Sequence, residues 1–174
     1  VSRVTLGLFD PNLLGHYVEA GAQYLKLGDT TSGVAWFKNP RLWGSRNGLD
    51  IQFWKTNRIR TKYKQNEDQP VPINGFLHSR DKFYLGYTRT WERELRSRLY
   101  YEYNDDSFSD RFVSDEIKAI LNNIGLPPNT IFHFVGIGMD YGLINYNNYL
   151  VSGSQLSIDF KYALSENTGI DNFV

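Results

Sequence analysis

The chain contains no cysteine among its 174 residues, so it can form neither a disulfide framework nor a thiolate metal site. Its 19 basic and 19 acidic side chains give a formal net charge of zero, which leaves no electrostatic basis for nucleic acid as the main partner. It has no run of about 18 apolar residues, so no membrane-spanning helix is expected. The sequence begins at Val1 without a methionine or a signal peptide, so we expect a processed or trimmed chain.

What the chain has in abundance is aromatic residues, at 16%, in stretches that alternate apolar and polar side chains. Gly136–Tyr141 and Ser154–Tyr162 show this alternation most clearly. A period of two is typical of a β-strand with one apolar and one polar face. Such stretches follow one another from Gly15 to Leu164 with almost no helix between them, which predicts a closed antiparallel barrel.

Turn residues divide the sequence into eight expected strands. The fourth strand begins near Gly48 and is expected to fade in the charged stretch Lys55–Lys64, and Asn66–Pro72 is expected to be a polar loop. The other seven strands are expected at Arg3–Phe9, His16–Leu27, Ser32–Lys38, Lys82–Trp91, Leu95–Tyr103, Ile131–Leu143 and Ser154–Leu164.

One segment departs from the β pattern. Ser114 can cap a helix, apolar residues recur after it at helical spacing, and Gly125 suits the position that follows the last helical turn. We expect a short amphipathic helix at Asp115–Ile124, in a helical loop insertion at about residues 114–125. The whole chain, residues 1–174, is expected to be one outer-membrane β-barrel domain or a fragment of one.

The two faces of the expected strands favour a membrane barrel over a soluble one. Several charged residues share the polar faces, too many for a small dry core, and they are expected to face a hydrated lumen. The alternative is a soluble lipocalin-like barrel whose apolar residues point inward. The expected lumen-facing charges are Arg96, Arg98, Glu102, Asp140, Asp159 and Lys161, and the expected lipid-facing residues are Val18, Ala22, Leu85, Leu99, Ile137, Leu156 and Ile158.

Aromatic residues near the strand ends fit the interfacial girdles of membrane proteins. The fold class expected from all these signs is all-β, an antiparallel transmembrane β-barrel with about eight strands in this chain and one short loop helix. The residues expected to anchor at the interface are Trp36, Trp43, Trp54, Trp91, Tyr101, Tyr103 and Tyr149.

Several short passages resemble the bacterial surface antigen family, the outer-membrane assembly factors of BamA and TamA type and the related two-partner secretion transporters. They are the turn Asp10–Gly15, the run Asn39–Gly44 before a new strand, the hairpin Phe83–Tyr103, and the passage Val135–Tyr162. The chain departs from the family pattern at Gly142–Asn145, where an Asp-x-Arg-Asp cluster is usual, and it lacks the family's Arg-Gly-aromatic motif.

The resemblance implies a sixteen-stranded barrel of which this chain matches about the second to the ninth strand. It also implies that the parent protein, in the bacterial outer membrane, inserts or exports polypeptides without nucleotide. The expected partners are then outer-membrane lipid and unfolded outer-membrane or secreted polypeptides, without nucleic acid. Eight strands cut from a wider cylinder are expected to leave an exposed edge, which makes edge-to-edge self-association possible.

Two other functions stay open on the sequence. One is a stand-alone eight-stranded outer-membrane barrel for anchoring, adhesion or small-ligand binding. The other is an outer-membrane hydrolase, for which His133 with Asp140 is the candidate pair. Because His16, His78 (expected in a loop) and His133 lack a recognised local nucleophile motif, we expect no catalytic residues and no enzyme.

No cofactor and no metal site are expected either. The acidic stretch that contains Asp105, Asp106 and Asp110 lacks the ligand periodicity and the terminal Glu of a calcium loop. We expect it to be a solvated loop tip.

Overall fold

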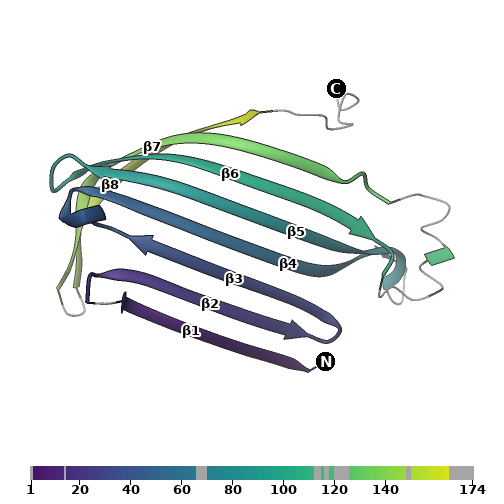
Figure 1. Cartoon of the computed structure of the whole chain (residues 1–174). Helices are drawn as coiled ribbons and strands as arrows, with labels where there is room; N and C mark the ends of the chain where they lie inside the picture. The colour runs from purple at the N-terminus through teal and green to yellow at the C-terminus, as the bar shows by residue number, and fades with distance from the viewer. Residues whose placement is uncertain are drawn as a thin grey trace.

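The computed structural model describes residues 2–13, 15–65, 70–111, 115, 118–119, 126–147 and 150–164. They form one antiparallel sheet whose strands follow chain order from β1 to β8 (Figure 1). The all-β class and the eight strands predicted from the sequence are confirmed. The strands are β1 Arg3–Leu13, β2 Val18–Leu27, β3 Thr30–Asn39, β4 Asn47–Gln65, β5 Pro70–Thr90, β6 Leu95–Ser109, β7 Thr130–Asn147 and β8 Leu150–Leu164, and the 3-10 turn η1 is Leu42–Gly44.

The sheet does not close on itself within the described residues. β1 pairs with β2 and β8 pairs with β7, and no ladder joins β1 to β8. Figure 1 shows the sheet curled, with β1 and β8 at its two ends. The chain therefore forms a curved wall with two free edges.

The strands β4 and β5 run further than the sequence predicts. β4 continues through the charged stretch Lys55–Lys64 because its residues pair with β5, as Arg58 does with His78. β5 begins at Pro70, inside the expected loop Asn66–Pro72, of which residues 66–69 lie outside the described residues. The backbone pairing between β4 and β5 stabilises these extra residues. Because their side chains do not alternate between apolar and polar, the sequence does not predict a strand there.

The expected helix Asp115–Ile124 falls mostly outside the described residues. Of its positions the structure describes Asp115, Lys118 and Ala119, which have helical backbone, and the Lys118 ammonium lies 3.5 Å from an Asp115 carboxylate oxygen. The helix as a whole stays a prediction. Nowhere in the described part of the chain is there a helix of the length and apolar character needed to cross a membrane.

The register assigns each side chain to one of two faces, because directly paired residues of antiparallel strands point to the same side of the sheet. The apolar face includes Leu6, Leu8, Ala22, Tyr24, Ala35, Phe53, Leu85, Leu99, Ile137, Met139, Leu156 and Ile158. The polar face includes Glu19, Trp36, Gln52, Tyr84, Arg98, Tyr100, Glu102, Asp140, Asp159 and Lys161.

The apolar face is the exposed one. Its exposed large side chains range from Leu85 at 38% to Leu8 at 83%, although Leu77 on the same face is buried, whereas Tyr100 and Glu102 on the polar face are each 8% exposed. The usual arrangement of a water-soluble protein is thus reversed. The shielded polar side chains occupy the inner side of the curl, where neighbouring strands bring them close together.

The aromatic residues expected at strand ends divide between the two faces. Trp36 and Trp54 lie on the polar face, so their expected role as interfacial anchors is wrong. The Trp36 indole N–H donates a 2.7 Å hydrogen bond to a Glu19 carboxylate oxygen, which shows how a polar-face tryptophan is satisfied. Trp43 in η1 is 95% exposed, and Tyr149 lies outside the described residues.

Glycines on β7 make room for large side chains on the polar face. The Tyr100 ring lies against Gly136, where an added methyl group would overlap the ring. A methyl group at Gly138 would come within 2.8 Å of a carboxylate oxygen of Asp159 and 3.0 Å of the Arg98 guanidinium. Side chains from β6 can therefore cross β7 and reach β8.

Gly136→Ala is expected to destabilise the folded sheet by about 1–3 kcal/mol, because the new methyl group must displace the Tyr100 ring. Gly7→Ala is the matched control, since its nearest neighbour would lie 3.4 Å away, in ordinary contact. Urea unfolding of both variants in lipid vesicles measures the difference. Equal stability of the two variants would show that the position of the Tyr100 ring does not require a glycine at residue 136.

Candidate functional site

The most shielded polar side chains form an inner charge network, which consists of Lys82, Arg98, Tyr100, Glu102, Asn104, Asp159 and Lys161. On one side of it, the Arg98 guanidinium donates a 2.9 Å hydrogen bond to one carboxylate oxygen of Asp159. The Tyr100 hydroxyl donates a 2.6 Å hydrogen bond to the other oxygen. Asp159 on β8 is thus tied to two side chains of β6.

Glu102 is the centre of the other half of the inner charge network. One of its carboxylate oxygens lies 3.0 Å from the Lys161 ammonium and accepts a 2.8 Å hydrogen bond from the Asn104 amide, and the other lies 3.0 Å from the Lys82 ammonium. A carboxylate that is 8% exposed needs such partners, because burying an unpaired charge is costly. The two lysines come from β5 and β8, so Glu102 connects strands on both sides of β6.

Four of the six predicted lumen charges, Arg98, Glu102, Asp159 and Lys161, therefore lie together on the polar face. The other two, Arg96 and Asp140, are opposite each other in the register, but no ion pair joins them among the described residues. Asp140 instead accepts a 2.7 Å hydrogen bond from the Ser157 hydroxyl. That all six line a lumen stays a prediction.

The seven predicted lipid-facing residues lie on strands whose register places them on the apolar face. Six of them are exposed, namely Ala22, Leu85, Leu99, Ile137, Leu156 and Ile158. Val18, at the first position of β2, is 8% exposed and does not share the open surface of the others. Lipid contact at these positions stays a prediction.

Sequence reasoning missed a second polar-face cluster, formed by His78, Arg80 and Asp106. Asp106 is 5% exposed and accepts hydrogen bonds from Arg80 at 2.7 and 2.9 Å, and the His78 ring lies 2.6 Å from it. The expectations of a loop around His78 and of a solvated acidic tip are wrong, because β5 and β6 extend past them as a pair. Phe108 stacks on His78 and contacts Phe76, and these apolar residues beside the cluster were apolar signals in the sequence.

This cluster lies beyond the apolar part of the strands. On the opposite side of the sheet at the same level, the outward residues are Lys55, Asp81 and Asp105, and the first two form an ion pair at 3.1 Å. Burial alone would raise the pKa of the Asp106 carboxyl. Hydrogen bonds from Arg80 and His78, together with their charges, outweigh burial, and the pKa lies below its usual value of 3.8.

The pair that the alternative hydrolase reading requires, His133 with Asp140, is not formed. His133 lies on the apolar face, where its Nδ1 is 2.6 Å from the Tyr101 hydroxyl, whereas Asp140 lies on the polar face. The seven positions that separate them in β7 put them on opposite sides of the sheet. Among the residues that the structure describes, no three His, Cys, Asp or Glu side chains are grouped to hold a metal ion.

Comparison with known proteins supports the fold. No protein-family model matches the chain, and no curated protein matches it. The chain is similar in structure to BamA from Haemophilus ducreyi, in a crystal structure that lacks POTRA domains 1–3, with a TM-score of 0.58 at 13% sequence identity. The match covers 93% of this chain and 31% of that one, so the chain spans about a third of its neighbour. The fold of the wall is thus similar to part of that protein.

Because the pKa of Asp106 is lowered on folding, its ionised form stabilises the fold fully above pH 3.8, and this stabilisation is lost as the pH falls through the lower folded value. We expect Asp106→Asn to cost stability near neutral pH and to cost progressively less below about pH 4. Denaturant unfolding over this pH range measures it. Asp29→Asn, at an exposed turn, is the control, and a constant cost for Asp106→Asn would contradict the expectation.

Proposed function

We propose that this chain forms part of the wall of a bacterial outer-membrane β-barrel that assembles or translocates polypeptides. The single observation that carries the proposal is the reversed pair of faces, with apolar residues exposed and a charge network shielded. The likeness to BamA supports a large barrel of this class. A one-layer sheet with these faces needs an apolar solvent on one side and water on the other.

The height of the apolar face fits a bilayer. In β6 its residues run from Leu95 to Tyr103, which matches the roughly 9–11 residues that a tilted strand needs to cross the hydrocarbon layer. Aromatic side chains with a polar end lie near both limits. Tyr87 donates a 2.8 Å hydrogen bond to Asn47 at one end, and Tyr103 contacts His133 at the other. Such rings are typical of the membrane interface.

The two free edges support a role with polypeptides. β1 and β8 each leave one side without a pairing strand among the described residues, and unpaired N–H and C=O groups can accept an added strand. The rest of a larger barrel, a strand of a client polypeptide, or a second copy of this chain would each satisfy such an edge. Within the proposal, the wall receives unfolded outer-membrane or secreted polypeptides without nucleotide.

The two other functions have less support. A stand-alone eight-stranded barrel would pair Val4–Leu8 with Leu156–Phe160, and the described sheet has no such ladder. A hydrolase would need the candidate groups on one face, and His133 and Asp140 are on opposite faces. The assembly or translocation role remains the one that the open wall favours.

Ile158→Arg tests the membrane position. If Ile158 faces the middle of the bilayer, the arginine is expected to cost about 2–4 kcal/mol of folding free energy in vesicles. Gln155→Arg, on the polar face of the same strand, is the control and is expected to change stability little. Equal costs for the two variants would refute a lipid-covered apolar face.

The assembly role is tested with the full-length protein that contains this chain, reconstituted in lipid vesicles. A urea-denatured outer-membrane barrel protein is added without nucleotide, and its folding is followed by protease resistance. We expect faster folding than in vesicles that carry an unrelated small barrel at equal protein mass. No acceleration by a correctly inserted protein would exclude the assembly role and leave the membrane position standing.

A further inference from the structure

A basic hollow lies at the end of the wall that carries the β3–β4 connection and the β5–β6 turn, away from the inner charge network. It has a volume of about 990 Å³ and is lined by the β3–β4 connection, which contains η1, and by the β5–β6 turn. The charged side chains that line it, and that we call the basic rim, are Arg41, Arg46, Arg93 and Arg96, together with the single carboxylate of Glu92.

The two segments that carry the basic rim are fastened to each other. The backbone N–H of Thr90 donates a 2.8 Å hydrogen bond to the Arg46 carbonyl, and the Arg46 guanidinium donates a 2.7 Å bond to the Trp91 carbonyl. The Asn39 side chain accepts a 3.0 Å hydrogen bond from the Arg41 backbone N–H, which fixes the start of the β3–β4 connection. Arg46 therefore has a structural role, and the hollow is formed before any ligand arrives.

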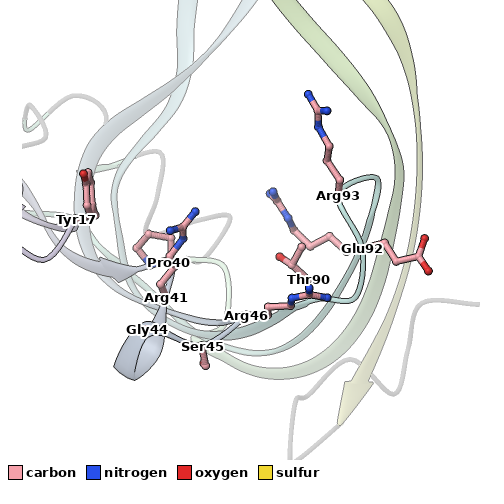
Figure 2. Close-up of a pocket in the computed structure, with 10 residues that line it drawn as sticks. Tyr17, Pro40, Arg41, Gly44, Ser45, Arg46, Thr90, Glu92 and Arg93 are labelled. Carbon is pink, nitrogen blue, oxygen red and sulfur yellow. The ribbon is translucent and has the colours of Figure 1, made fainter.

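The other three arginines have charges that the fold does not use. Among the described residues, the guanidinium groups of Arg41, Arg93 and Arg96 take part in no ion pair and no side-chain hydrogen bond. Figure 2 shows Arg41 and Arg93 extending into the space inside the arc of strands, while Glu92 extends in another direction. This is the arrangement of a cationic site open to an incoming anion.

The spread of the arginines indicates an elongated ligand with several negative charges. Figure 2 shows Arg41, Arg46 and Arg93 at separate places around the arc and not pointing to one common point. The hollow is also at the upper end of the roughly 300–1,000 Å³ range of small-molecule pockets. Arginine forks suit carboxylates, and an extended acidic peptide presents carboxylates at intervals.

The position of the hollow argues against a lipid headgroup. Thr90 and Arg96 pair in the register and lie on the polar face, the side opposite to the exposed apolar residues. The exclusion of a lipid headgroup rests on the proposed membrane position, whereas the preference for an anionic ligand rests only on the unpaired arginines. We propose that the basic rim binds an acidic segment of a polypeptide at the end of the wall formed by the β3–β4 connection and the β5–β6 turn.

The test uses the full chain in detergent micelles and a fluorescein-labelled peptide of alternating Glu and Gly, with fluorescence anisotropy as the readout at low ionic strength. A peptide with Gln in place of Glu is the ligand control. The variant is Arg41→Gln/Arg93→Gln/Arg96→Gln. The matched protein control is Arg3→Gln/Arg58→Gln/Arg60→Gln, which removes three arginines from the polar face near the opposite ends of the strands. Circular dichroism verifies that both variants fold.

We expect the Glu peptide to bind the unmodified chain, the rim variant to bind about tenfold more weakly, and the control variant to bind almost as well as the unmodified chain. Added salt is expected to weaken binding. Equal losses in the two variants, or no binding of the Glu peptide, would overturn the proposal. So would binding of inorganic phosphate or of phosphatidylglycerol nanodiscs that depends on the rim arginines while the peptide does not bind. None of these outcomes depends on assembly activity.

Discussion

The exposure of apolar side chains on one face of a single-layer sheet is the constraint on which the rest of the structure depends. Within the described residues no large side chain is fully buried, and the buried apolar residues are Val18, Phe76, Leu77 and Tyr100. Full burial of one large aliphatic or aromatic side chain contributes about 1.5–3 kcal/mol, and a sheet without a covering layer forgoes most of it in water. The apolar face therefore requires a covering medium, which is lipid under the proposed membrane position, and the paired strands lose no backbone hydrogen bonds there.

On the polar face, charged side chains that are shielded from solvent are stabilised by ion pairs and hydrogen bonds to one another. Arg98 and Tyr100 reach Asp159 across β7 because Gly136 and Gly138 present no side chains there. Glu102 is held between two lysines, one from β5 and one from β8. These contacts add to the apolar pattern in fixing the register, since a slip by one residue would move every charge to the apolar face. Arg41, Arg93 and Arg96 of the basic rim lie outside this network and form no ion pair among the described residues.

The sequence predicted the features that follow from local alternation of apolar and polar residues. It did not predict the features that arise only when two strands pair. The faces of β2, β6, β7 and β8 follow directly from period two, and so does the inward position of Arg98 and Asp159. The extension of β4 past Lys55 and the burial of Asp106 arise only when two polar strands pair, so no local pattern reveals them. Trp36 and Trp54 were misassigned because aromatic residues suit both an interface and a shielded polar face.

The absence of cysteine allows the central claim to be tested by single-cysteine scanning along β7 without background. Nitroxide labels placed one at a time from Phe134 to Tyr141, in the vesicle-reconstituted chain, report collisions with dissolved oxygen in lipid and with a water-soluble nickel complex. We predict oxygen accessibility at Val135, Ile137 and Met139, and access to the nickel complex at Phe134 and Asp140, with a period of two. Uniform accessibility along the strand, or the opposite phase, would contradict a wall that faces lipid on one side and water on the other.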